Sequence, residues 1–136
     1  MRPLLSLIVL IWVGFVQAQS SPVTDEEIKP IYFEPMNYPL VARIKHIQGV
    51  VVLLAKLDRT GNVTATEAVS GAEALIQDCL TNAKKWRFQP NPHGNVVIIY
   101  EFRIEGLCHA PCLSQFSFKP PNEATIRIGE QVVDHD

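Results

Sequence analysis

The spacing of apolar residues changes at Gly49 from a helical period to a strand period. Before Gly49, apolar residues recur every three to four positions, which is typical of one face of a helix. Pro39 suits the first turn of that helix, where its missing N–H is tolerated. After Gly49, residues 50–57 alternate between two directions and are largely apolar in both. A strand that is apolar on both sides is expected in the middle of a sheet.

A hairpin and a second helix follow. The sequence Asp-Arg-Thr-Gly at residues 58–61 predicts a tight turn into a second strand at residues 63–69. Ser70 and Glu73 have the spacing of a capping box, which predicts the start of a helix. Its expected apolar face consists of Ala72, Leu75, Ile76, Cys79, Ala83 and Trp86, and its expected wet side of Asp78, Thr81, Asn82 and Lys85. Pro90 and Pro92 are expected to end it.

The next strand is predicted at residues 96–105, where apolar and polar positions alternate. Ile98, Tyr100, Phe102 and Ile104 share one face, and Ile99, Glu101, Arg103 and Glu105 share the other. One polar face indicates a half-exposed strand. The order helix–strand–strand–helix–strand predicts an α+β domain at residues 36–106, with two helices packed on one face of a small antiparallel three-stranded sheet. Residues 107–136 are expected to form a short C-terminal extension rather than a second domain.

The N-terminus has the pattern of a secretory signal. Arg2 is followed by an apolar run at residues 4–16, and Val16-Gln17-Ala18 fits a small-residue cleavage site. We expect cleavage after Ala18, a flexible lead-in at residues 19–35 and export to the periplasm. The alternative is an uncleaved inner-membrane anchor, although the apolar run is short for a bilayer.

Charge and motifs narrow the function. The formal net charge is −2, which favours neither nucleic acid nor an anionic membrane surface as partner. The sequence contains no nucleophile elbow, phosphate-binding glycine loop or paired-histidine zinc motif. We therefore expect a protein without enzymatic activity, cofactor or small-molecule substrate.

Three cysteines, Cys79, Cys108 and Cys112, would meet an oxidising compartment after export. A structural disulfide is the default expectation, either between Cys108 and Cys112 or from one of them to Cys79. Two alternatives remain open: a copper or zinc site that uses Cys108, His109 and Cys112, or a redox-active cysteine pair. No metal site is assigned, because a complete zinc site needs four ligands.

Several of these segments together resemble the C-terminal domain family of TonB, a periplasmic module that engages outer-membrane receptors. The resemblance rests on Tyr38-Pro39, the strand that begins at Gly49, the turn that ends at Gly61, Ser70-Gly71, and Trp86-Arg87-Phe88-Gln89-Pro90. It covers about half of the chain. We expect the matching residues Tyr38, Pro39, Gly49, Gly61, Trp86, Phe88 and Pro90 to serve folding rather than recognition.

The resemblance also implies a binding mode. In this family an extended segment of the receptor pairs with the last strand of the domain, here residues 96–105. The partner would be an outer-membrane receptor or another envelope protein, in the context of transport across the outer membrane. The residues that would face the partner from this edge strand are Val97, Ile99, Glu101 and Arg103. The alternative function is an envelope structural or assembly protein whose sheet edge is capped by its own tail or by homodimerisation.

Overall fold

The computed structural model describes residues 28–90 and 94–133. The predicted signal segment, its cleavage site and the first part of the lead-in therefore lie outside the described residues. The elements in chain order are β1 (Pro30–Tyr32), α1 (Leu40–Ile44), β2 (Gly49–Leu57), β3 (Val63–Ser70), α2 (Glu73–Ala83), β4 (Arg87–Phe88), β5 (Asn95–Cys108), β6 (Gln115–Lys119) and β7 (Glu123–Gln131). Within these residues, no helix combines the length and the apolar character needed to cross a bilayer.

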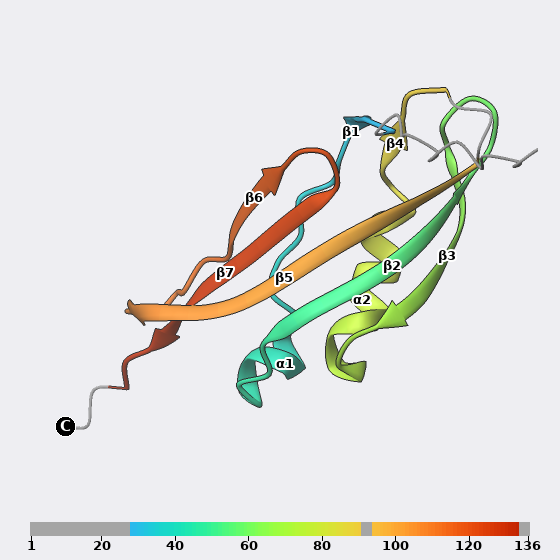
Figure 1. The fold of residues 1–136 in the computed structure, drawn as a ribbon. Coiled ribbons are helices and arrows are strands. Elements are labelled where there is room, and N and C mark those ends of the chain that lie inside the picture. The colour runs from blue at the N-terminus through green and yellow to red at the C-terminus, as the bar shows by residue number, and fades with distance from the viewer. Residues whose placement is uncertain (1–27, 91–93, 134–136) are drawn as a thin grey trace, which may run out of the picture.

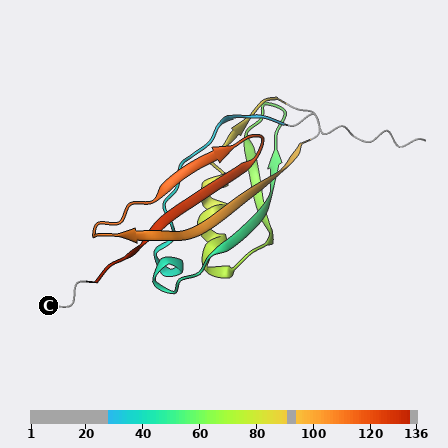
Figure 2. The same cartoon turned by 60° about the vertical axis from the view of Figure 1, so that its left-hand side comes forward.

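The main sheet has five strands in the order β3-β2-β5-β7-β6, and a separate two-stranded sheet pairs β1 with β4. Both helices lie on one side of the main sheet, and within the described residues the other side carries no helix (Figures 1 and 2). The predicted α+β class, with two helices on one face, is thus confirmed.

The predicted number of strands was wrong. We expected three antiparallel strands, but the extension adds β7 and β6 beyond β5. β7 runs parallel to β5, whereas β2, β3 and β6 pair antiparallel with their neighbours. The physical reason is the alternation within β7, whose residues Ala124, Ile126 and Ile128 are buried in the same core as β5. The extension is therefore part of the domain.

Aromatic side chains pack against one another in and beside the core. The residues assigned to folding from the sequence include Tyr38, Trp86 and Phe88, and all three are buried. Phe33 packs against Trp86 and stacks on Phe118, with ring centroids 6.1 Å and 4.4 Å apart. Because Phe33 precedes the predicted domain boundary, the described end of the lead-in is packed onto the domain.

Three details of α2 differ from expectation. The helix has Ala72 at its N-cap with no side-chain capping bond, so the predicted capping box of Ser70 and Glu73 does not form. Ser70 instead belongs to β3, where it pairs with Val52. Asn82 was expected on the wet side, but it is buried, because the indole of Trp86 and the phenol of Tyr100 both donate hydrogen bonds to its side-chain oxygen. The helix ends at Ala83, before Trp86 and the prolines.

Gly61 shows why the hairpin turn needs glycine. Its φ is +89°, and a Cβ there would lie 1.9 Å from the carbonyl oxygen of Phe88. The same backbone approach lets the N–H of Phe88 donate to the Gly61 carbonyl at 2.9 Å. The β2–β3 turn is therefore fixed against the segment that follows α2, and a side chain at this position would force the two apart.

Candidate functional site

β5 was predicted as the binding edge, but it lies inside the sheet, with β2 on one side and β7 on the other. The β7 pairing covers the predicted site residues: Ile99 lies opposite Glu123, Glu101 opposite Thr125, and Arg103 opposite Arg127. The prediction that Val97, Ile99, Glu101 and Arg103 form an edge strand was therefore wrong. The edge is instead capped by the chain's own extension, as the alternative function supposed, because β7 pairs with β5 where the resemblance implies a partner strand.

The alternation within β5 nevertheless puts these four side chains on the helix-free side of the sheet. Ile98, Tyr100 and Phe102 are buried, whereas Val97 is 40% exposed and the other three are half-buried. A partner could thus contact the side chains of this face. The backbone of β5 from Ile99 onward is already paired with β7.

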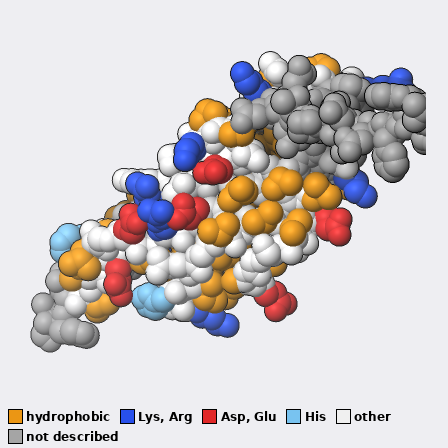
Figure 3. Space-filling model, in the orientation of Figure 1, with side chains coloured by type: hydrophobic (Ala, Val, Ile, Leu, Met, Phe, Trp, Pro, Cys, Tyr) orange, Lys and Arg blue, Asp and Glu red, His pale blue; other side chains and the backbone are white. Residues whose placement is uncertain are grey.

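The helix-free face has an apolar half over β2 and the start of β5. The register puts Val52 opposite Ile99 and Leu54 opposite Val97. Val50, on the same side of β2, is 49% exposed. Figure 3 shows hydrophobic side chains gathered on this face. We call these five residues the open-face patch.

The charged half of the same face centres on Arg103. Its guanidinium pairs with Glu101 and, at 3.3 Å, with Glu105, and Arg127 of β7 lies 3.8 Å from Glu105. The hydrogen bond and negative charge of Glu101 raise the pKa of Arg103, with a smaller contribution from Glu105. Two cations thus balance two anions. Exposed pairs of this kind add little stability, so their main effect is on what can approach the face.

The free edges of the main sheet are β3 and β6, since neither has a second strand partner within the described residues. β3 is eight residues long and β6 five. The start of β6 also lies next to the chain before α1, because Ser114, the residue before β6, accepts a hydrogen bond of 2.9 Å from the N–H of Tyr38. The longer free edge is therefore on the opposite side of the sheet from the predicted one.

Cys108 and Cys112 form a disulfide, and Cys79 is a free, buried thiol. Burial, with a smaller contribution from Asp78, raises the pKa of Cys79 well above its ordinary value. Because the sulfurs of Cys108 and Cys112 are bonded to each other, they do not offer thiolates to a metal in this state. No cluster of three potential metal ligands occurs among the residues that the structure describes.

The functional element that the sequence left open is β7, which entered the prediction only through the alternative of a tail that caps the sheet edge. Ala124, Ile126 and Ile128 alternate with polar residues, a pattern that indicates a strand. The pattern does not say which strand is the neighbour. Only the structure shows that this strand adds to β5.

Comparison with known proteins agrees with the resemblance. The family model described as Gram-negative bacterial TonB protein C-terminal matches residues 34–105, just over half of the chain. Protein TonB of Vibrio cholerae serotype O1 is 35% identical over 70 residues, which cover 50% of this chain and 29% of that protein. Protein TonB of Pseudomonas aeruginosa is 26% identical over 94 residues, which cover 63% of this chain and 28% of that protein. The chain thus spans less than a third of the length of these relatives.

A solved structure is also similar, the solution NMR structure of the Pseudomonas aeruginosa TonB CTD. Its sequence identity is 24% and the TM-score is 0.48, and the match covers 61% of this chain and 92% of that one.

Proposed function

The chain belongs to the family of Gram-negative bacterial TonB protein C-terminal domains, and from this premise we propose that it is a periplasm-facing binding module of the cell envelope. It acts without catalysis and takes part in transport across the outer membrane. Its partner is an outer-membrane receptor or another envelope protein, which it engages through an extended segment that adds as a strand. The family match, the two TonB relatives and the free sheet edge support this proposal.

The β5 edge is not where we expect the partner to bind. β7 pairs with β5 along Ile99–Ile104, and its residues Ala124, Ile126 and Ile128 are almost fully buried. Removing β7 would expose Ile126 and Ile128, which each contribute roughly 1.5–3 kcal/mol on burial, and the smaller side chain of Ala124. A partner strand that replaced β7 would have to recover that loss before it gained any affinity. The extension therefore closes the family's binding edge in this chain.

The partner strand is instead expected at β3. The single observation that carries this assignment is the eight-residue outer edge of β3, which has no strand partner among the described residues. Unpaired backbone N–H and C=O groups along such an edge are a template for an added strand. Val69 of β3 is 64% exposed and offers an apolar contact at this edge. The parts of the partner outside the added strand can contact the open-face patch and the charged side chains around Arg103, both on the adjoining face of the sheet.

A second function is favoured by the β5–β7 pairing itself. In that alternative the protein is a structural or assembly component of the envelope, with one edge capped by its own extension and the other used for homodimerisation. A free β3 edge can pair with β3 of a second copy as well as with a receptor segment. The two functions make different predictions for hydrogen exchange at the β3 amides. Receptor binding makes their protection depend on a partner, and homodimerisation makes it depend on the concentration of the protein.

Amide hydrogen exchange on residues 19–136 distinguishes them, with a synthetic peptide as probe. The peptide carries the extended N-terminal segment of an outer-membrane receptor from the same genome. Receptor binding predicts fast exchange for alternate β3 amides at every protein concentration, and slow exchange once the peptide is added. Suppose instead that the β3 amides become more protected as protein concentration rises, and that adding the peptide changes nothing. That result would contradict receptor binding and support the assembly function. Protection that appears in β6 rather than β3 would contradict the assigned edge.

A further inference from the structure

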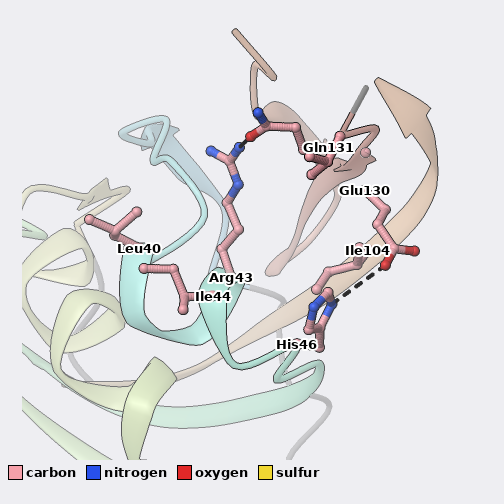
Figure 4. A pocket seen from close by; sticks show the side chains of 9 residues that line it. Leu40, Arg43, Ile44, His46, Ile104, Glu130 and Gln131 are labelled. Carbon is pink, nitrogen blue, oxygen red and sulfur yellow. Dashed lines mark hydrogen bonds and ion pairs between the residues drawn. The ribbon is translucent and has the colours of Figure 1, made fainter. Parts of the chain in front are cut away.

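A cavity of about 460 Å³ lies between α1 and the ends of β5 and β7 (Figure 4). One wall comes from α1 and the residues after it, including Leu40, Arg43, Ile44 and His46. The facing wall includes Glu130, Gln131 and Val133 of the extension, which lies beyond the family match at residues 34–105. One wall of the cavity therefore belongs to the part of the chain that matches the family, and the facing wall to the part that lies beyond the match.

The size and lining of this cavity fit a ligand site. Ligand pockets measure roughly 300–1,000 Å³ and combine apolar walls with a few polar groups. Leu40, Ile44 and Val133 are each about two-thirds exposed, so the apolar walls are not covered by other described residues. Burying three such side chains against a ligand would remove apolar surface from water.

Arg43 gives the cavity its chemical preference. Among the described residues, the only polar contact of its side chain is with the side-chain oxygen of Gln131 at 3.5 Å, the outer limit of a hydrogen bond. A guanidinium has five N–H donors in a planar fork that matches a carboxylate. Most of these donors therefore remain available to an anionic ligand, and Figure 4 shows the Arg43 side chain reaching toward Gln131 across the cavity.

Glu130 is the one carboxylate among the lining residues that the structure describes. Glu130 lies 4.0 Å from the imidazole of His46, which faces it across the cavity (Figure 4). His46 has a φ of +53°, a left-handed backbone conformation that is uncommon for residues other than glycine. This conformation follows α1 directly and turns the chain toward β2. No carboxylate among the described residues makes an ion pair with Arg43, so its guanidinium is the cation that this lining offers to a ligand.

We propose that this cavity binds the C-terminal residue of a partner polypeptide, one with an aliphatic side chain and a free carboxylate. A C-terminal residue carries both groups on one Cα, so its side chain can rest on Leu40 and Ile44 while its carboxylate reaches Arg43. The proposal does not rest on strand addition at β3, which lies at the far edge of the sheet. It assigns the extension a second role, as one wall of a recognition site.

The test is an NMR titration of ¹⁵N-labelled residues 19–136, which retain every described residue. The probe is the hexapeptide acetyl-Gly-Ser-Gly-Ala-Val-Leu with a free carboxylate, compared with the same peptide as its C-terminal amide. The free acid should shift the amides of residues 40–46 and 129–133, with a dissociation constant of roughly 1 mM or tighter. The amide form should bind at least about tenfold more weakly, because it lacks the charge that Arg43 pairs with.

Two charge-removing variants test whether the peptide binds in the cavity or elsewhere on this surface. Arg43→Gln should weaken binding of the free acid by about tenfold and leave the weak binding of the amide form unchanged. The control is Lys45→Gln, which removes the same charge two residues away, outside the cavity lining, and should change affinity less than about twofold. Equal binding of acid and amide, an equal effect of both variants, or saturable binding of decanoate with no response to either peptide would overturn the proposal.

Discussion

The side-chain oxygen of Asn82 accepts a hydrogen bond of 2.9 Å from the indole nitrogen of Trp86 inside the core. The phenol of Tyr100 donates to the same oxygen at 2.8 Å, and the Asn82 amide nitrogen donates to the Glu34 carbonyl. One buried amide therefore links α2, β5 and the chain before α1. No buried side-chain polar atom among the described residues lacks a partner.

Replacing Asn82 should be strongly destabilising. Asn82→Ala leaves two buried donors without an acceptor, each at a penalty of about 1–3 kcal/mol, so we expect the free energy of unfolding to fall by about 3 kcal/mol. The control is Gln77→Ala on the exposed side of the same helix, which should change it by less than about 0.5 kcal/mol. Urea denaturation of both variants measures the difference, and equal losses would contradict a structural role for this amide.

Truncating a core side chain in β7 tests whether the extension belongs to the domain. Ile126 is fully buried, so Ile126→Ala should lower the free energy of unfolding by about 2–5 kcal/mol. Arg127→Ala, on the exposed side of the same strand, is the matched control and should have little effect. If Ile126→Ala unfolds at the same urea concentration as the wild type, β7 is an appendage and the β5 edge is open.

Cysteine titration tests the disulfide assignment. The oxidised protein should expose a single thiol per chain, that of Cys79, and only after denaturation, because Cys79 is buried and Cys108 is bonded to Cys112. A thiol reagent such as DTNB, applied before and after adding guanidinium chloride, counts these groups. One thiol that reacts in the folded protein, or three after unfolding without reductant, would contradict the assignment.

Stability should decline at alkaline pH because of Cys79. Burial raises the pKa of its thiol in the folded state, so above about pH 8.5 the unfolded chain loses this proton while the folded chain keeps it. The unfolded state then binds fewer protons, and the free energy of unfolding falls as pH rises, by up to about 1.4 kcal/mol per pH unit. Tyr100, whose pKa is also raised by burial, adds to the decline above about pH 10.

The variant Cys79→Ala isolates the contribution of the thiol. It should flatten the decline between about pH 8.5 and 9.5, where tyrosine is still protonated in both states. Urea denaturation across this range measures the slope for each protein. An equally steep slope in the variant would mean that another group is responsible.

The local elements were predictable from the sequence because periodicity reports burial directly. The alternation in β2 and β5 identified both strands and gave the correct faces for Ile98, Ile99, Tyr100 and Glu101. The prediction put Asn82 on the wet side of the helix because its side chain is polar. Its spacing from Cys79 and Trp86, however, is that of the apolar face. A polar residue at a core spacing can mark a buried hydrogen-bond acceptor, as it does here.

The candidate site was less predictable because strand order depends on contacts between distant segments. The alternation of Ala124, Ile126 and Ile128 indicates a strand but not its neighbour. A parallel neighbour of β5 requires the chain to return to the same end of the sheet, and residues 109–122 with β6 provide that return. The cavity beside Arg43 depends on the same long-range pairing, which no local pattern reports.

The most direct test of the account is hydrogen exchange at three β5 amides, those of Ile99, Glu101 and Arg103. The N–H of Ile99 donates to the Asn122 carbonyl, on the side of β7, and alternate residues of a strand point their N–H groups the same way. In the protein of residues 19–136, without any partner, we predict slow exchange at all three amides. The amides of Ile98, Tyr100 and Phe102, which point toward β2, should exchange equally slowly. Fast exchange at Ile99, Glu101 and Arg103 beside slow exchange at the other three would show an open edge at β5, and would contradict closure by the extension.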